Sequence, residues 1–474
     1  MQVKNQLFIG GKWIDTNKKL DVINPADETL ITQVSLSTDK EHEFALESAH
    51  QAFQSWSKTA PRVRAEILRK AFELMIANAD FLSELITKEN GKVLADSKSE
   101  ILYAAEFFRW FSEEAVRIEG EYRTSPSGDK KILVTKQPIG VSVLITPWNF
   151  PAAMATRKLG PALAAGCTVI LKPASETPLT AIAIVQLLEQ AGVPAGVVNL
   201  VLPEKTGEAI SKMLHDKRVR NLSFTGSTEV GRLLLKEAAD SVIRCSMELG
   251  GNAPFIVLDD ADIDAAVAGA MIAKMRNGGA ACTSANRFYV SEKIVKEFTE
   301  KFSKEMQKLK VGNGLDKSTQ LGAYVSIKER EKIAELVSAS INAGAKVEIG
   351  ANKPNAAGAF YNPTVLSVKK DNLILEKEIF GPVAPIVSFK SDEEAIQLAN
   401  ATDFGLISYV FSDNLSRALK VAESLESGMV AINRGVISDP AAPFGGYKQS
   451  GLGREGGFDG INEFLETKYI GLNI

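Results

Sequence analysis

Cysteine is scarce in this sequence of 474 residues, which contains three: Cys167, Cys245 and Cys282. An odd and sparse set in a long chain does not form a disulfide framework, so the sequence indicates a reducing compartment. Cys167 and Cys245 lie in apolar, strand-like runs, where a cysteine usually serves as a small buried hydrophobic residue. Cys282 differs from them because its surroundings are polar and rich in glycine.

The sequence also lacks a long hydrophobic run and a strong excess of one charge. The longest uncharged stretch, between Lys136 and Arg157, is interrupted by prolines and by Asn149, so we expect a strand and a loop there rather than a membrane span. The 55 basic and 58 acidic residues leave a formal net charge of −3. The N-terminal residues lack the apolar core of a signal peptide. We therefore expect a cytoplasmic protein with no nucleic-acid partner, no membrane partner and no metal site.

The length predicts two or three domains, and the pattern of apolar residues predicts an α/β fold. Residues 1–35 are typical of short strands and turns, and residues 39–119 show helical periodicity. Apolar runs then alternate with helical patterns, and the predicted strands are 141–146, 168–171, 197–202 and 221–225. This alternation indicates a parallel sheet with helices on both faces, which binds ligands at the carboxyl ends of its strands. Asn149 and Lys172 follow two of these strands.

A second alternating block extends from about residue 254 to 432. Helices are predicted at 180–190 in the first block and at 260–274, 294–310 and 326–343 in the second. Residues 466–472 form an extended run near the end of the chain.

Particular segments contain residue types suited to chemistry. In Phe224–Gly231, a strand feeds into a glycine turn and an amphipathic helix (Leu233, Leu234, Ala238), whose first N–H groups could hold phosphate. The spacing GxxxxG differs from the GxGxxG of an ordinary dinucleotide fold. Glu248 precedes a Gly-Gly turn, where a carboxylate is usually solvated. Arginines flank the segment of Cys282, and nearby positive charge predicts a thiol pKa below about 8.5 and a nucleophilic thiolate.

Motifs over essentially the whole chain resemble, in order and spacing, the aldehyde dehydrogenase superfamily. They are ITPWNFP at 145–151, LKPAS at 171–175, FTGS at 224–227, ELGG at 248–251, GxxC at 279–282, EIFGP at 378–382 and PFGGxK at 443–448. The resemblance implies a Rossmann-type dinucleotide-binding domain, an α/β catalytic domain, and β oligomerisation arms with a C-terminal segment. Their limits would be 1–120 with 142–253, then 254–432, and finally 121–141 with 433–474. It also implies a homodimer or homotetramer, in which the arms add strands to a neighbour's sheet.

The same resemblance implies the roles of the site residues. Cys282 would attack the aldehyde carbon and form a thiohemiacetal, whose oxyanion the side-chain amide of Asn149 and the backbone N–H of Cys282 would hold. After hydride transfer to the nicotinamide, Glu248 would act as the general base for hydrolysis of the thioester. Glu378 would hold the nicotinamide ribose, and Phe380 would pack beside it. The other cofactor-binding residues implied are Thr146, Pro147, Trp148, Lys172, Ser175, Gly226, Ser227 and Leu249.

Ser175 bears on the choice between NAD and NADP. Lys172 would contact the adenosine ribose, and many NAD-preferring relatives carry a glutamate three residues after this lysine. A serine there removes the repulsion of a 2′-phosphate and leaves Lys172 free to pair with it. Glu176, next in the chain, restores part of the acidic character. The prediction is NADP as the preferred cofactor, with NAD possible.

Within the superfamily, segments 148–158, 276–279, 284–290 and 437–438 are most similar to the succinate-semialdehyde dehydrogenases. In that family the arginines matching Arg157 and Arg276 bind the distal carboxylate of the substrate, and Ser438 matches a further hydroxyl donor. An arginine offers a planar, permanently charged fork that fits a carboxylate. The predicted reaction is therefore oxidation of succinate semialdehyde to succinate.

Other functions stay open at this point. The substrate could be glutarate semialdehyde, a 2-oxoglutarate semialdehyde or an aliphatic aldehyde, although the arginines argue against the last. A non-catalytic structural protein could keep the same fold. Acyl transfer to coenzyme A is disfavoured because the base, Glu248, is present. Two departures from the family pattern are Ala280, where many relatives have glutamine, and Ser284, where some have a second cysteine. We therefore predict no redox-switch disulfide at Cys282.

Overall fold

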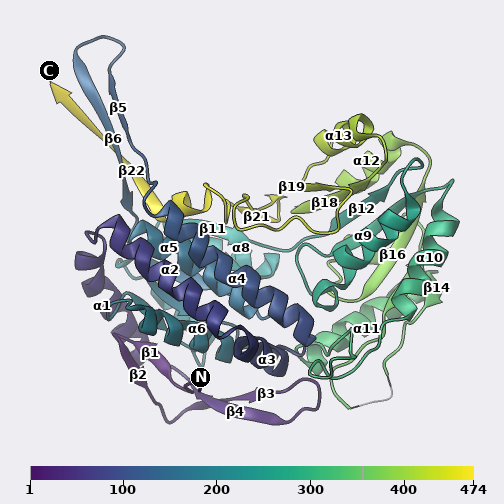
Figure 1. Ribbon diagram of the computed structural model, residues 1–474, viewed down its shortest axis with the longest axis horizontal. Coiled ribbons are helices and arrows are strands. Elements are labelled where there is room, and N and C mark those ends of the chain that lie inside the picture. Colours follow the sequence, from purple (N-terminus) through teal and green to yellow (C-terminus); the bar gives the residue numbers. More distant parts are fainter. Residues whose placement is uncertain (1, 355–356, 474) are drawn as a thin grey trace.

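Two large sheets organise the chain, and a slender three-stranded sheet projects from them (Figure 1). The computed structural model describes residues 2–354 and 357–473. The outer limits of the predicted domains, residues 1 and 474, and residues 355–356 of the predicted catalytic domain lie outside the described residues.

The first sheet has eight strands in the order β2-β1-β9-β8-β7-β10-β11-β21. Its five central strands, from β9 to β11, are parallel, and antiparallel strands complete both edges. The strands predicted from the first alternating block are therefore confirmed. The bounds are β1 Leu7–Ile9, β2 Lys12–Ile14, β7 Val141–Ile145, β8 Thr168–Lys172, β9 Val198–Leu200, β10 Val219–Thr225, β11 Arg244–Glu248 and β21 Gly451–Leu452.

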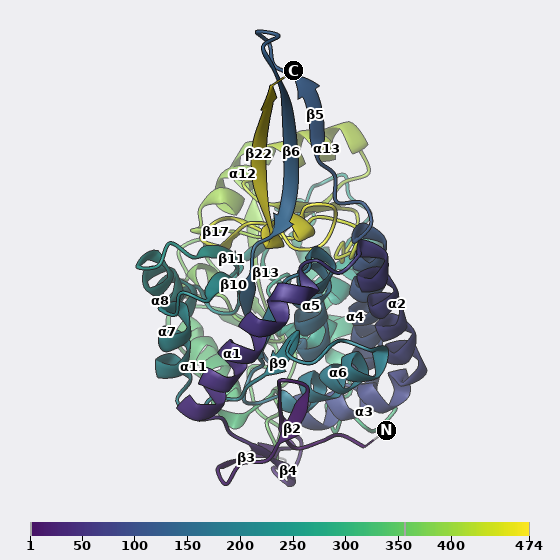
Figure 2. The same cartoon turned by 90° about the vertical axis from the view of Figure 1, so that its left-hand side faces the viewer.

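Helices cover both faces of this sheet, as predicted (Figure 2). One face carries α1 Asp39–Trp56, α7 Thr206–Leu214 and α8 Thr228–Ala239. The other carries α5 Pro151–Ala165 and α6 Pro178–Ala191, with α2 Pro61–Ala77, α3 Ala79–Asn90 and α4 Leu94–Glu114 packed outside them.

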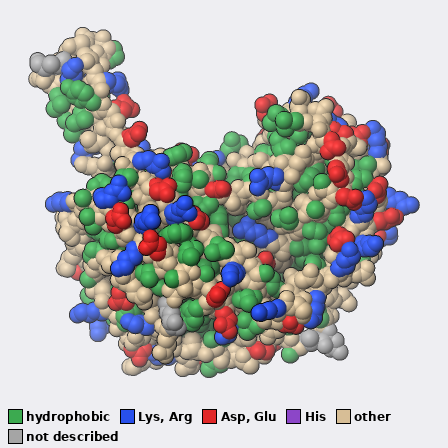
Figure 3. Space-filling model, viewed as in Figure 1, with side chains coloured by type: hydrophobic (Ala, Val, Ile, Leu, Met, Phe, Trp, Pro, Cys, Tyr) green, Lys and Arg blue, Asp and Glu red, His purple; other side chains and the backbone are tan. Residues whose placement is uncertain are grey.

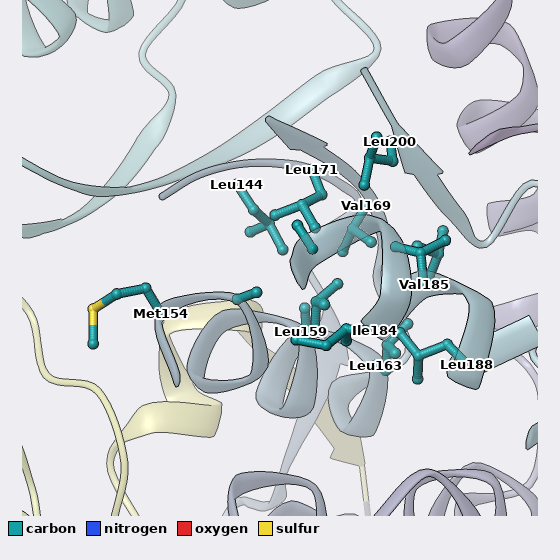
Figure 4. Close-up of a cluster of buried hydrophobic side chains, with 14 of the residues drawn as sticks. Leu144, Met154, Leu159, Leu163, Val169, Leu171, Ile184, Val185, Leu188 and Leu200 are labelled. Carbon is teal, nitrogen blue, oxygen red and sulfur yellow. The ribbon is translucent and has the colours of Figure 1, made fainter. Parts of the chain in front are cut away.

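The core between the sheet and α5 and α6 consists of aliphatic side chains from strands and helices (Figure 4). Leu144, Val169 and Leu171 reach it from the strands, and Leu159 and Ile184 reach it from the helices, all fully buried. Every residue of α5 is buried, which is typical of a helix in the middle of a domain. The position of α5 is therefore fixed closely, and with it the loop that precedes it.

The second sheet has seven strands in the order β14-β15-β16-β13-β12-β18-β19, all parallel to their neighbours except β14. Helices α9 and α10 pack on one face and α11, α12 and α13 on the other, which confirms the second alternating block. The bounds are β12 Ala253–Val257, α9 Ile263–Met275, β13 Ala285–Ser291, α10 Val295–Gln307, α11 Ile327–Asn342, β14 Lys346–Ile349, β15 Thr364–Ser367, β16 Val383–Phe389, α12 Asp392–Asn400, β18 Ile407–Phe411, α13 Leu415–Glu423 and β19 Met429–Ile432.

The projecting sheet has the order β22-β6-β5. Among the described residues β22 pairs with β6 alone, so one edge of this sheet is open. Apolar side chains gather on the projection (Figure 3), where Tyr122 is 66% exposed and Tyr469 56% exposed. The bounds here are β5 Glu121–Thr124, β6 Lys130–Pro138 and β22 Leu465–Asn473, and the minor elements are β3 Lys19–Ile23, β4 Leu30–Ser35, η1 Arg276–Gly279, η2 Leu373–Glu376, β17 Phe404–Gly405, β20 Tyr447–Lys448 and η3 Gly460–Phe464.

None of the helices within residues 2–354 and 357–473 is both long enough and apolar enough to cross a membrane. The cysteines are unpaired. Cys167 is fully buried, as expected, whereas Cys245 is only half-buried because it lies on β11, next to the two-residue edge strand β21.

Candidate active site

A cavity of about 1020 Å³ lies between the two large sheets. Thr146, Lys172 and Thr225, at the carboxyl ends of β7, β8 and β10, form one wall, and Cys282 and Glu378 belong to the other. Ligands of parallel sheets bind at this edge. The predicted site residues that line the cavity are Thr146, Pro147, Trp148, Asn149, Arg157, Lys172, Ser175, Gly226, Ser227, Leu249, Arg276, Cys282, Glu378, Phe380 and Ser438.

The turn before α8 places the start of a helix at the cavity wall. Ser227 caps the helix by accepting a hydrogen bond from the N–H of Val230 (3.4 Å). Gly226 has no space for a side chain, since a Cβ would come within 2.5 Å of the Phe224 ring. The free N–H groups of a helix start attract anions.

The exposed side of α8 is apolar where it faces the cavity. Val230 is 44% exposed and Leu233 64% exposed, and both line the cavity. Leu234 and Ala238 pack inward as the sequence predicted, but Leu233 does not. An exposed apolar strip of this kind can pack against the flat ring of a nucleotide base. The sequence analysis did not identify it because Val230 and Leu233 have the helical spacing of core residues.

Lys172 lies at the end of β8, nearly buried. Burial lowers the pKa of its ammonium group, and the charge of Glu176 opposes that shift. Ser175 and the exposed Glu176 line the same part of the cavity. The charge of Lys172 thus has one weak, solvated counterion nearby.

Glu378 is held by the backbone N–H of Gly251, which donates to its Oε1 (3.0 Å). Burial raises the pKa of the Glu378 carboxyl to about 7. Trp148 and Phe380 meet edge to face, with ring centroids 5.4 Å apart. Lys274, fully buried, lacks a hydrogen-bond partner for Nζ among the described residues, and burial lowers its pKa to about 7. The sequence analysis did not detect Lys274, which sits within an apolar helical pattern.

The Cys282 thiol is half-buried at the cavity wall. Burial raises the pKa of this thiol to about 12, and the charges of Arg157 and Arg276 only partly oppose it. The sequence-based expectation of a lowered thiol pKa is therefore wrong for this ligand-free state, because the loss of water outweighs the nearby arginines. Gly251 lets the neighbouring loop approach, since a Cβ there would come within 2.3 Å of the Cys282 carbonyl oxygen.

Asn149 faces the same cavity, and its side chain has one fixed contact. Its Nδ2 donates to the carbonyl oxygen of Ala280 (3.1 Å). An amide nitrogen carries two hydrogens, so one stays available for a ligand. The backbone carbonyl of Ala280 therefore holds the Asn149 amide in place. Ser284 is buried, and its hydroxyl lies 3.5 Å from the carbonyl oxygen of Lys274.

Glu248, at the end of β11, differs from the other predicted residues because it is missing from the described residues that line the cavity. Its carboxylate is buried, and neither oxygen has a hydrogen-bond partner among the described residues. Burial and the charge of Glu455 raise the pKa of Glu248 well above its usual range, against the opposing charges of Arg157 and Lys158. Glu455 itself pairs with Lys158 (2.6 Å). The sequence analysis identified neither Glu455 nor Lys158 as a residue of the site.

Two arginines converge on Tyr103 at the end of the cavity near the thiol. The guanidinium groups of Arg157 and Arg276 both lie 5.8 Å from the centroid of its ring, and Arg157 Nη2 donates to its hydroxyl (2.6 Å). Arg157 Nη1 also lies 3.5 Å from Glu455. Ser438 lines the same cavity. Tyr103 lies far from the sequence motifs, on a helix whose apolar spacing predicts packing.

Cys282 and the start of α8 line the same cavity, so a nucleophilic thiol and a place for phosphate lie together. The model of the aldehyde dehydrogenase family matches residues 13–470, and the chain belongs to this family. The expected α/β fold class is confirmed, and the protein is an NAD(P)-dependent oxidoreductase that acts on a small aldehyde.

Individual relatives are similar over almost the full length. The chain is 52% identical to a succinate-semialdehyde dehydrogenase of Paenarthrobacter nicotinovorans, over 94% of this chain and 99% of the relative. It is 48% identical to a glutarate-semialdehyde dehydrogenase of Pseudomonas putida, over 99% and 98%. The crystal structure of an NADP-dependent enzyme of Escherichia coli is 45% identical and superposes with a TM-score of 0.98, covering 100% of this chain and 98% of that one.

Proposed function

We propose that this protein oxidises succinate semialdehyde to succinate, with NADP⁺ as the preferred acceptor and NAD⁺ as a second one. The observation that carries the proposal is the pair Arg157 and Arg276 beside Tyr103, in the cavity that also contains Cys282. A short aldehyde with a distal carboxylate needs a fixed positive charge one short chain away from the thiol. The similarity to a succinate-semialdehyde dehydrogenase supports the same substrate.

In the proposed reaction Cys282 is the nucleophile. The thiol gives its proton to water in the cavity and its Sγ bonds to the aldehyde carbon. The second N–H of the Asn149 amide, with the backbone N–H of Cys282, stabilises the resulting oxyanion. When bound, NAD(P)⁺ supplies a hydride acceptor. Glu248 then takes a proton from the water that cleaves the thioester and releases the carboxylate. Because this carboxylate does not line the cavity, we expect its side chain to swing toward Cys282 during deacylation.

The residues that would hold the cofactor fit a nicotinamide dinucleotide. Gly226 and Ser227 offer the backbone cradle for the pyrophosphate, and the exposed Val230 and Leu233 offer a surface for the adenine ring. Glu378 would accept hydrogen bonds from the nicotinamide ribose. Thr146, Pro147, Trp148, Leu249 and Phe380 complete the proposed cofactor site.

The preference for NADP⁺ is proposed from the surroundings of the adenosine ribose. Lys172 offers a positive charge for a 2′-phosphate, and Ser175 offers a hydroxyl where a glutamate would repel it. Glu176 is exposed, so water screens its charge. The printed description of the Escherichia coli structure as NADP-dependent supports the same choice.

A second candidate substrate is glutarate semialdehyde, which the similarity to the Pseudomonas putida enzyme favours. One experiment decides: reduction of NAD⁺ and NADP⁺ by the purified protein with succinate semialdehyde, glutarate semialdehyde and butanal. Preference for succinate semialdehyde with NADP⁺ supports the proposal. Preference for glutarate semialdehyde would assign a substrate that is one methylene longer. Preference for butanal refutes the role of the arginines.

We also propose the larger organisation of the protein. Residues 1–120 and 142–253 would form the dinucleotide-binding domain, 254–432 the catalytic domain, and 121–141 and 433–474 the arms and C-terminal segment. The open edge of β22 and the exposed Tyr469 support a homodimer or homotetramer built through these arms. A cytoplasmic location stays a prediction, which the unpaired cysteines support.

A further inference from the structure

A buried ion pair, Lys92 and Glu100, hydrogen-bonds to the backbone where α5 begins. Neither residue has a role in the site predicted from the sequence. Lys92 Nζ donates to Glu100 Oε2 (2.6 Å) and to the carbonyl oxygen of Asn149 (2.6 Å). The other carboxylate oxygen of Glu100 accepts from the backbone N–H groups of Ala152 (2.8 Å) and Ala153 (3.3 Å). The pair therefore joins α4 to the first turn of α5 and fixes the peptide of Asn149.

The sharp turn at the end of α3 aims Lys92 inward. Gly91 ends this helix in the left-handed conformation (φ 93°), which only glycine adopts readily. Asn90, on the other side of Gly91, donates from Nδ2 to the carbonyl oxygen of Trp148 (2.8 Å). One turn thus supplies contacts to two consecutive carbonyl groups of the loop that carries Asn149.

Asn277 makes the matching contact from the loop of the thiol. Its Nδ2 donates to the carbonyl oxygen of Asn149 (2.8 Å) and to that of Ala280 (2.9 Å), while its backbone N–H donates to Asp96 (2.9 Å). Its backbone has φ 53°, the left-handed conformation. The Asn149 side chain donates to the same Ala280 oxygen. Asn277 therefore ties the oxyanion amide to the chain two residues before Cys282.

We propose that Asn277 and the Lys92–Glu100 pair are positioning residues, which hold the Asn149 amide and the backbone N–H of Cys282 at a fixed separation as one oxyanion hole. This inference rests on the proposed function. Stability alone explains the arrangement poorly, because a buried ion pair is often no more stabilising than apolar residues and a left-handed asparagine is strained. Oxyanion donors act only when they are placed to within about 0.5 Å.

Asn277→Gly tests the proposal directly. Glycine keeps the left-handed backbone and the N–H that reaches Asp96, so the variant removes only the amide of Asn277. The rate of NADPH formation in the first turnover, measured by stopped flow with succinate semialdehyde, should fall about 10- to 100-fold, since one oxyanion donor is misplaced rather than lost. The KM for aldehyde and the Kd for NADP⁺ should stay within about twofold.

Asn199→Gly is the matched control. Asn199 is a buried residue of β9 whose Nδ2 also donates to two carbonyl oxygens, those of Val169 (3.2 Å) and Gly196 (2.8 Å), and it is not among the described residues that line the cavity. This variant should lower Tm without lowering the first-turnover rate.

The ion pair needs two variants because Lys92→Met leaves Glu100 buried without its partner, which destabilises the fold. In Lys92→Met/Glu100→Gln both charges are gone, and the glutamine can still accept from Ala152 and Ala153. The double variant should regain most of the lost Tm, while its first-turnover rate should stay about as low as that of Asn277→Gly.

An unchanged first-turnover rate in Asn277→Gly, or an equal loss of rate in Asn199→Gly, overturns the positioning role. So does a double variant whose rate recovers together with its Tm. If the wild-type protein oxidises no aldehyde, the proposed function and this inference fail together. An active wild type with an unaffected Asn277→Gly variant refutes the positioning role alone.

Discussion

Replacing Arg276 offers the cleanest test of carboxylate recognition. Arg157 is less suitable because it also lies 3.5 Å from Glu455 and hydrogen-bonds Tyr103, so its loss disturbs other charges. Arg276 lies against the rings of Phe150 (4.9 Å) and Tyr103 (5.8 Å), and its charge also acts on Asp96 and on the Cys282 thiol. The effect of Arg276→Ala on the thiol is common to all aldehydes, so the difference between a carboxylated and an uncharged aldehyde isolates the interaction with the substrate carboxylate.

The expected loss follows from the burial of Arg276. Removing one partner of a desolvated charge pair costs about 2–5 kcal/mol, and because Arg276 is only half-buried we expect the lower part of this range. About 2–3 kcal/mol corresponds to a roughly 30- to 150-fold lower kcat/KM for succinate semialdehyde. Butanal, of the same chain length but without a carboxylate, should lose about threefold at most.

Steady-state reduction of NADP⁺ gives, for each of the two aldehydes, the ratio of kcat/KM between wild type and variant. Arg276→Lys, which keeps the charge without the planar fork, should fall between wild type and Arg276→Ala. Arg69→Ala, on the exposed side of α2 beside Glu73, is a control for a lost surface charge and should change neither ratio. Equal losses with succinate semialdehyde and butanal in Arg276→Ala would show that Arg276 supports the pocket without recognising the carboxylate.

Three further results are expected. Ser175→Glu should lower kcat/KM with NADP⁺ roughly tenfold and spare NAD⁺, because a carboxylate about 4 Å from a 2′-phosphate at a half-exposed position repels it; an equal effect on both cofactors would contradict this. Glu248→Gln should keep a burst of about one NADPH per site and then stop, since deacylation lacks its base; loss of the burst would place Glu248 before hydride transfer. Alkylation of Cys282 in the ligand-free protein should be slow at pH 7 and should still accelerate between pH 8 and about pH 9.5, because burial raises the thiol pKa and only the thiolate reacts; a plateau near pH 8 would show that burial does not dominate.

The sequence predicts the parts of the site that depend on local order. The apolar runs end at Ile145, Lys172 and Thr225, and parallel strands bring such ends to one edge, so the cluster of Thr146, Lys172 and Gly226 follows from alternation alone. The glycines of the turn before α8 could likewise be interpreted without the structure, because they have a steric reason. The family resemblance implies the roles of the site residues, and the structure brings all of these residues except Glu248 to the lining of one cavity.

What the sequence does not predict depends on distant contacts. Tyr103 has the spacing of an ordinary helical residue and Lys92 lies in the turn between α3 and α4. Only the packing of α4 against α5 brings them to the site. The thiol pKa shows the same limit. Flanking arginines are visible in the sequence, but the protein that excludes water from Cys282 comes from both large sheets, and its effect is larger and of opposite sign.

The electrostatics of the cavity favour an anionic aldehyde even before contacts are counted. Burial raises the pKa of the Cys282 thiol to about 12, so the thiol is neutral near pH 7 in the ligand-free state. Arg157 and Arg276 both line the cavity. Glu455 lies 3.5 Å from Arg157, and the charge of Arg276 acts on Asp96, which is not among the described residues that line the cavity. A substrate carboxylate supplies a negative charge beside Arg276 on the cavity side.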